Sequence, residues 1–271
     1  MHNWTWQTWR GKSYLTCDLV TQPHGFFTSA FAPQRPETLT GALSSSADVL
    51  RTKQVHGNVV LGSTDIQAGT RMLVVSGNRL PAAEESIQRP HADGCFSDRA
   101  GQAAWVCTAD CTPALIADQT TGQVAAVHAG WRGTARKIVP VAIGKLQAQG
   151  SLLSNLRVLL GPAIAGEVYQ VGEDVAAEIG KSVLEQAETL SAEAVVSQLL
   201  SLDNSPLLPD TEPGRVRLDV RRINQMQLVQ LGLSSEQISI APHCTYQEPN
   251  HFFSYRRTKL KQVQWSGIVS T

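Results

Sequence analysis

The sequence predicts an α+β fold, a single domain of mixed β-sheets flanked by helices. Strand-like runs occur in clusters as well as in alternation with helical segments, which favours mixed sheets over a purely parallel one. A chain of 271 residues suits one large domain with a sizeable core. It shows no internal repeat, low-complexity tract or clear inter-domain linker. We therefore expect residues 1–271 to form one domain.

The N-terminal part alternates short strands with turn-like segments. Residues 3–9 and 13–20 alternate in polarity and predict two strands, with Trp4, Trp6 and Trp9 in the core. Residues 32–48 are rich in Pro, Gly and Ser, and predict a mobile loop. A strand is expected to end near His56, with a second strand after it, and residues 88–98 are expected to form a turn.

The rest of the chain predicts further strands and several amphipathic helices. Strands are expected over residues 103–107, 114–118, 123–129, 156–162, 238–242 and 262–270. One helix is expected over residues 134–150, with Pro140 either kinking it or delaying its first turn. One or two helices are expected over residues 172–202, and another over residues 218–233, ending at Gly232.

The composition of the chain limits which classes of binding partner and which cellular location we expect. Lys plus Arg and Asp plus Glu number 23 each, and no basic stripe interleaved with aromatics appears, which argues against nucleic acid. No signal-peptide pattern and no apolar run of about 18 residues is present, so we expect no membrane association. The five cysteines lack C-x-x-C spacing, which favours reduced thiols and the cytoplasm.

Cys111 and His128 stand at the ends of neighbouring apolar runs. Cys111 lies in a turn where Pro113 is expected to prevent simple strand pairing. His128 is followed by Gly-Trp-Arg-Gly, which opens a helix whose free N–H groups, together with Arg132, favour an anion. His56 precedes another glycine and supplies a third nitrogen or sulfur group. Taken singly, each has an ordinary structural explanation.

Several motifs together resemble one known family. They are KQVHG (53–57), ADG (92–94), TADCTP (108–113), AVHAGWRGTA (126–135), GPAI (161–164) and FFSYRR (252–257). In this order, from about Pro23 to Arg257, they resemble the YfiH-like laccase-domain family, also called polyphenol oxidases or purine nucleoside phosphorylases. Several motifs in one order are far more specific than any single motif.

The resemblance implies a metal site made of His56, Cys111 and His128. Two imidazoles and one thiolate leave a fourth position open, as in catalytic zinc sites, although the same donors also suit copper. We expect zinc. The resemblance also implies phosphorolysis of adenosine, inosine and S-methyl-5′-thioadenosine, with adenosine deaminase activity. The implied ligands are a purine nucleoside and phosphate, and a monomer or homodimer is expected.

Further residues are candidates for catalysis and substrate binding. Arg132 and Lys53 are candidates for holding phosphate, while Tyr255 and Arg256, with Arg257 beside them, suit stacking on a purine or contacting phosphate. Cys111, His128, Arg132 and Asp110 form the expected catalytic set. Asp93 and Asp110 are candidates to accept a proton or to orient a metal-binding histidine, because such imidazoles usually donate their second N–H to a carboxylate or carbonyl. Either aspartate equally suits an Asx turn.

The sequence departs from the family pattern at several places. The usual GPAIGPCCYEVG is GPAIAGEVYQVG here, so a cysteine pair is missing. Gln247 stands where a second thiol is common, and Ser29 replaces an arginine. The loop at residues 32–48 replaces a helix, which predicts a more open pocket wall.

Three other functions stay open on the sequence alone. The first is a copper-dependent polyphenol oxidase, against which the chain holds only seven histidines. The second is a hydrolase in which a histidine activates the Cys111 nucleophile. The third is a binding module that a structural metal stabilises.

Overall fold

Three β-sheets form the framework in the computed structural model, which describes residues 2–74 and 88–271. The first sheet has the strand order β1-β2-β3-β15-β7-β4, the second β14-β10-β8-β9-β6-β5, and the small third β11-β13-β12. The strands are β1 (Trp4–Trp9), β2 (Lys12–Cys17), β3 (His24–Phe27), β4 (Asp48–Leu50), β5 (Val60–Gly62), β6 (Gly94–Phe96), β7 (Gln102–Thr108), β8 (Thr112–Asp118), β9 (Val124–Ala129), β10 (Leu156–Leu160), β11 (Gln170–Gly172), β12 (Leu207–Pro209), β13 (Arg215–Leu218), β14 (Ile238–Ile240) and β15 (Gln264–Val269).

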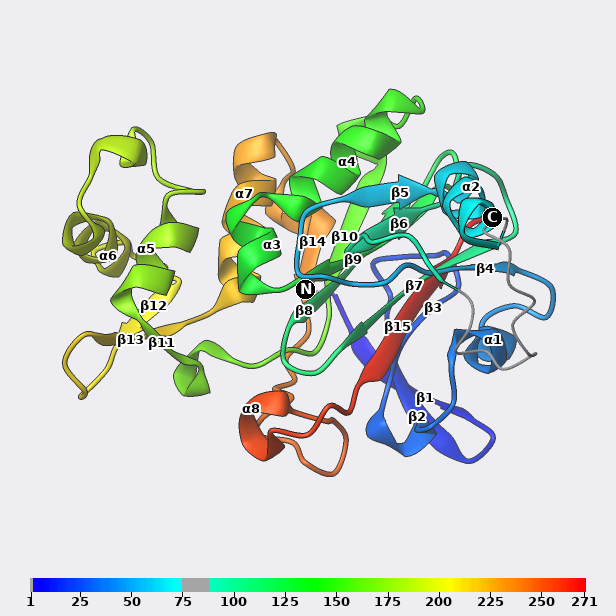
Figure 1. Cartoon of the computed structure of the whole chain (residues 1–271), viewed down its shortest axis with the longest axis horizontal. Helices are drawn as coiled ribbons and strands as arrows, with labels where there is room; N and C mark the ends of the chain where they lie inside the picture. The colour runs from blue at the N-terminus through cyan, green and yellow to red at the C-terminus, as the bar shows by residue number, and fades with distance from the viewer. Residues whose placement is uncertain (1, 75–87) are drawn as a thin grey trace.

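Helices flank these sheets, so the predicted α+β architecture with mixed sheets is confirmed (Figure 1). The α-helices are α1 (Pro36–Leu39), α2 (Ser63–Val74), α3 (Trp131–Ala135), α4 (Ile138–Ala148), α5 (Glu173–Gly180), α6 (Ala192–Leu200), α7 (Val220–Leu231) and α8 (Tyr255–Thr258). The pairs β4–β7, β5–β6 and β10–β14 are parallel, whereas the other pairings in the two large sheets are antiparallel.

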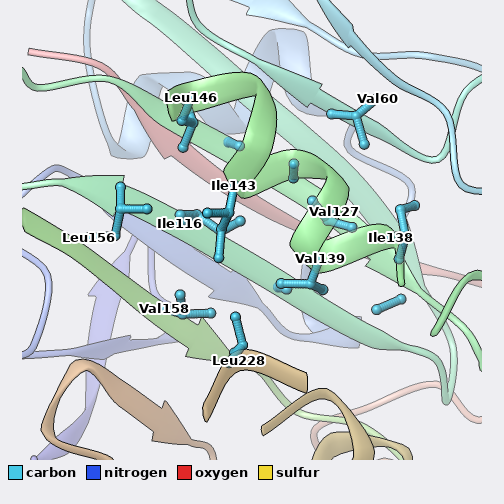
Figure 2. Close-up of a cluster of buried hydrophobic side chains, with 14 of the residues drawn as sticks. Val60, Ile116, Val127, Ile138, Val139, Ile143, Leu146, Leu156, Val158 and Leu228 are labelled. Atoms are coloured by element: carbon cyan, nitrogen blue, oxygen red, sulfur yellow. The ribbon is translucent and has the colours of Figure 1, made fainter. Parts of the chain in front are cut away.

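The central strands of the second sheet are buried on both faces. Ile116 of β8 packs in the core beneath α4, whereas its neighbour Leu115 packs in the core shared with the first sheet. This alternation follows from the two-residue period of a strand. Figure 2 shows Ile143 of α4 near Ile116, and Val139 of α4 belongs to the same core cluster. Both faces of these strands are apolar, so chemistry is left to the strand ends.

Local signals explain where the well-predicted helices begin and end. In α7 the Asp219 carboxylate accepts hydrogen bonds from the N–H groups of Arg221 and Arg222, and Gly232 ends the helix at φ 108°. Helix α4 begins at Ile138, later than the expected residue 134. Pro140 therefore falls in the first turn, where N–H groups have no partner within the helix and proline is tolerated.

Three local expectations were wrong. Residues 32–48 are not a plain loop, because they contain α1 and a 3-10 turn at Thr40–Ala42, and Thr40 accepts a hydrogen bond from the buried Trp105 indole. The strand before His56 ends at Leu50, and residues 94–96 form β6. Tertiary contacts stabilise these short elements, so local periodicity does not reveal them.

Two side-chain expectations also need correction. Trp6 is 38% exposed, whereas Trp4 and Trp9 are partly buried against the core. Pro113 lies within β8, in register with His128. The His128 N–H points away from β8 and donates to the Asp93 carbonyl, so it needs no partner on Pro113. Proline therefore removes no hydrogen bond between these two strands.

Candidate metal centre and substrate pocket

Three strand ends and one loop bring His56, Cys111 and His128 together. Cys111 lies in the turn between β7 and β8, and His128 is the next-to-last residue of β9. Because β8 and β9 are antiparallel, the start of one strand meets the end of the other, and Thr112 pairs with Ala129. His56 comes from the loop between β4 and β5. One nitrogen or sulfur atom of each residue lies within 4.8 Å of the others.

The two imidazoles meet nearly at right angles. The ring centroids of His56 and His128 are 4.7 Å apart, with an interplanar angle of 86°. His128 is buried, Cys111 is partly exposed and His56 is exposed. The cluster therefore opens to solvent on the His56 side.

Asp93 connects two of these residues. Its fully buried carboxylate lies 2.9 Å from Nδ1 of His128 and accepts hydrogen bonds from the N–H groups of Val55, His56 and Gly57. A carboxylate only accepts, so Nδ1 of His128 is the donor. Nε2 of His128 is then the nitrogen that can bind a metal.

The negative charge of the Cys111 thiolate and the positive charge of the His128 imidazolium stabilise each other. Burial raises the pKa of Cys111, but His128 and His56 outweigh it and bring the value to about 6. Burial lowers the pKa of His128, but Cys111 and Asp93 outweigh it and raise the value to about 9. A thiolate is the form that binds metal, so the cluster favours a metal ligand at Cys111.

The donor set fits a single ion with an open position. Thiolate sulfur and imidazole nitrogen are the common ligands of zinc, and three protein ligands are typical of catalytic zinc sites. Within the described part of the chain, this is the one group of at least three His, Cys, Asp or Glu side chains placed to share an ion. Copper accepts the same donors, so the geometry does not select the metal.

A pocket of about 600 Å³ lies over the cluster. Aromatic and cationic side chains contribute much of its wall. The lining residues include His56, Cys111, His128, Trp131, Arg132, Tyr169, Tyr255, Arg256, Lys259 and Lys261. This volume is in the range of pockets that bind small molecules. Residues 32–48 are not among the lining residues, so this segment forms no part of the pocket wall.

Arg132 lies at the pocket, as its place after His128 predicts. Its guanidinium carbon is 4.3 Å from the centroid of the Trp131 ring, and its side chain is exposed. Helix α3, which holds both residues, has only five residues. The anion preference predicted for this segment therefore depends on the Arg132 charge more than on a helix dipole.

Helix α8 and the residues after it, in the C-terminal part of the chain, form another part of the pocket wall. Tyr255 and Arg256 line the pocket, and the Arg256 guanidinium donates to the Gln170 carbonyl and stacks 4.8 Å from the Tyr169 ring. Burial raises the pKa of Tyr169 to about 12, so its hydroxyl stays protonated at neutral pH. Arg257 points elsewhere and donates to three backbone carbonyls, which indicates a structural role.

Asp110 joins the cysteine turn to that C-terminal segment. Its Oδ1 accepts from the Thr245 hydroxyl and its Oδ2 from the Arg256 N–H, each at 2.7 Å. Its φ is 94°, a left-handed value that Asp tolerates better than most residues. Both oxygens are engaged within the protein, which makes Asp110 a positioning group for the pocket wall.

Lys53 is not brought to the pocket. It is exposed, forms a backbone bridge with His91 and is not a lining residue, whereas its neighbour Gln54 is. The Gln54 amide donates to the Cys107 carbonyl and accepts the Cys107 N–H. The Gln54 side chain therefore pairs with the edge of β7 beyond the end of β4, and it anchors the loop that carries His56.

Lys259 and Lys261 also line the pocket. The sequence analysis did not predict them, because no local pattern distinguishes them from other surface lysines.

Comparisons with known proteins find relatives that cover nearly the whole chain. A purine nucleoside phosphorylase of Synechocystis is 52% identical over 98% of this chain and 97% of its own length. An adenosine deaminase from an unknown prokaryotic organism is 30% identical, over 55% of this chain and 51% of its own. The crystal structure of YlmD from Geobacillus stearothermophilus superposes with a TM-score of 0.77 at 22% identity, over 99% of both chains.

The family profile described as multi-copper polyphenol oxidoreductase laccase matches residues 33–269. The matched region contains the His-Cys-His cluster and every residue named above as lining the pocket. No helix in the described part of the chain has the length and apolar character needed to cross a membrane. By its sequence profile and its fold, the chain belongs to the laccase-domain family of YfiH-like and YlmD-like proteins.

Proposed function

We propose that this chain is a metal-dependent purine nucleoside phosphorylase that acts on adenosine, inosine and S-methyl-5′-thioadenosine and also deaminates adenosine. The observation that carries the proposal is the His-Cys-His cluster at a pocket with four cationic side chains. The relatives named purine nucleoside phosphorylase and adenosine deaminase support it. We also infer a cytoplasmic location from the five cysteines, all of which are free.

The cationic side chains suit an anionic co-substrate. Arg132 and Arg256 lie in the wall with Lys259 and Lys261, and among the lining residues that the structure describes the one carboxylate is that of Asp110. The four cations outnumber the carboxylate of Asp110 and the thiolate of Cys111, so the net charge of these lining residues is positive. Guanidinium groups bind phosphate through paired hydrogen bonds, so we assign the arginines to phosphate and the lysines to its attraction.

The aromatic side chains suit the purine. Tyr255 is 50% exposed at the pocket, and Tyr169 and Trp131 also line it. Flat rings provide stacking surfaces for a base and exclude water from one face. We assign the nucleoside to the space between these rings and the metal cluster.

In phosphorolysis, a phosphate oxygen forms a bond to the ribose C1′ while the bond from C1′ to the purine N9 breaks. The base leaves with the electron pair of that bond and takes up a proton, for which the hydroxyl group of hydrogen phosphate is the net source. The arginines hold the phosphate on the face opposite the departing base, and Asp110 keeps the Arg256 backbone in place. A zinc ion, when bound, supplies Lewis acidity that polarises oxygen or lowers the pKa of water.

Release of hypoxanthine from inosine tests the proposal. Zinc-loaded protein is expected to release the base only when phosphate is present, and the His128→Ala variant is expected to lose this activity. Lys145→Ala is a matched control, because Lys145 is exposed on α4 and does not line the pocket. Metal-loaded wild-type protein without base release or deamination would contradict the proposal.

Two other functions have one supporting observation each. The family description names copper and phenol oxidation, and copper accepts the same three ligands. The lowered pKa of Cys111 beside His128 would also suit a nucleophilic thiolate. Oxidation of a phenol by copper-loaded protein supports the first. Covalent labelling of Cys111 by substrate, in protein without metal, supports the second.

A further inference from the structure

We propose that Asp93 is the positioning residue of the metal site, because one buried carboxylate sets both the loop that carries His56 and the ring nitrogen that His128 presents. This inference rests on the proposed metal site but not on the proposed reaction. Asp93 directly precedes β6 and is hydrogen-bonded to the loop at residues 55–59 and to strand β9. It is fully buried.

The carboxylate holds three successive N–H groups of the loop. Oδ1 accepts from His56 at 2.8 Å and Oδ2 accepts from Gly57 at 2.7 Å, while Val55 lies 3.1 and 3.2 Å from the two oxygens. Such a concave run of N–H groups is a natural site for an anion. Here the anion is the protein's own carboxylate.

This arrangement explains the backbone of His56. Its φ is 60°, in the left-handed region that residues other than glycine rarely adopt. A conformation of this kind persists when surrounding contacts determine it. The hydrogen bonds to Asp93 are those contacts, and they direct three N–H groups of the turn to one side.

The same oxygen that accepts from His56 also accepts from the His128 ring. The distance from Oδ1 to Nδ1 is 2.9 Å. The backbone of Asp93 adds two more bonds, since its N–H donates to Val59 and its carbonyl accepts from His128 at 2.7 Å. Asp93 thus joins both histidine segments through main chain and side chain together.

Asparagine at position 93 cannot preserve both the hydrogen bonds to the His56 loop and the hydrogen bond to the His128 ring. If the amide oxygen faces His128, the NH₂ group faces the Gly57 N–H, and two donors oppose each other. If the amide is reversed, its NH₂ group meets Nδ1 of His128 and favours the tautomer that carries its proton on Nε2. The first orientation disturbs the loop of His56, and the reversed one disturbs His128 and also opposes the His56 N–H, which shares the same oxygen. Loss of such a supporting group typically costs about 10- to 100-fold in metal affinity.

The test is zinc binding by the full chain without substrate, measured by competition with a chromophoric chelator. Asp93→Asn is expected to bind zinc about 10- to 100-fold more weakly than wild type. The matched control is Asp98→Asn, which alters another hydrogen-bonded carboxylate near the opposite end of β6, with partners Ser63, Thr64 and Gln102. Its zinc affinity is expected to stay unchanged.

Long-range ¹H–¹⁵N spectra of zinc-loaded wild type provide a second measurement that needs no variant. His128 is expected to bind zinc through Nε2 and to keep its proton on Nδ1. Binding through Nδ1, or equal zinc affinity of Asp93→Asn and wild type, would overturn the inference while leaving the proposed function standing. Wild type that binds no zinc would overturn both.

Discussion

Gly130 lies directly against the sulfur of Cys111. A β-carbon on Gly130 would stand 2.9 Å from the Cys111 Sγ and 3.6 Å from the His56 Cδ2. The backbone of Gly130 has φ −70° and ψ 167°, which any residue adopts. The glycine is therefore needed for space next to the sulfur and not for its conformational freedom.

Gly130→Ala should consequently weaken metal binding more than it weakens the fold. The methyl group displaces the thiolate from its place beside the histidines, and we expect zinc affinity to fall by about 10-fold or more. Isothermal titration with zinc measures this. Gly144→Ala is the matched control, because a β-carbon there meets nothing within 4 Å. That helical site should gain about 0.5–1 kcal/mol in unfolding free energy. Unchanged zinc binding by Gly130→Ala would contradict the crowding argument.

Variants of Arg132 and Lys53 should differ in their KM for phosphate. Arg132 lines the pocket and Lys53 does not. Loss of charge-assisted hydrogen bonds to phosphate costs about 1.5–3 kcal/mol, so Arg132→Ala should raise the KM for phosphate by roughly 10- to 100-fold. Lys53→Ala should leave it unchanged. Initial rates at saturating inosine measure both, and a larger effect at Lys53 would contradict the assignment.

Asp110→Asn should act through the pocket wall. One of the two acceptor oxygens becomes an NH₂ group, from which the Thr245 hydroxyl can accept, so both contacts persist as neutral hydrogen bonds that are weaker than the present charge-assisted ones, at a cost of about 1 kcal/mol of unfolding free energy. Urea denaturation measures this loss, with the exposed Asp203→Asn as the surface control.

In enzyme kinetics, the same Asp110→Asn variant should raise the KM for nucleoside more than it lowers kcat, because the segment with Tyr255 and Arg256 shifts. A large fall in kcat with unchanged KM would instead favour the direct catalytic role that the sequence suggested for Asp110.

Protonation of His24 should destabilise the fold in mild acid. Burial lowers the pKa of His24, and its Nε2 accepts the Cys17 N–H while Nδ1 bonds to the Gln22 carbonyl. The unfolded chain, with an ordinary histidine pKa of about 6.5, therefore binds the proton more readily. The stability contribution is full above that value and is lost as the pH falls below it.

The urea midpoint should accordingly drop between pH 7.5 and pH 5 more steeply in wild type than in His24→Gln, which cannot titrate at this position. The comparison of the two slopes removes the contributions of the other titrating groups. Equal slopes would show that His24 titrates at the same pH in the folded and unfolded chains.

Periodicity in the sequence was sufficient for the long, regular elements. The apolar runs that became β7, β8 and β9 and the capped helix α7 were predicted close to their observed bounds. The short strands β4 and β6 and helix α1 were not, because elements of three or four residues depend on their neighbours for stability. Helix α2 and the small sheet of β11, β12 and β13 were also not predicted.

For the site, the sequence alone determined the chemical identity of the donors and the order of the motifs that contain them. Only the tertiary structure decided which carboxylate serves which group: Asp93 contacts His128 and the His56 loop, whereas Asp110 contacts Thr245 and Arg256. It also placed Lys259 and Lys261 in the pocket and Lys53 outside it. These contacts join residues distant in the chain, so strand pairing and packing establish them and no local pattern encodes them.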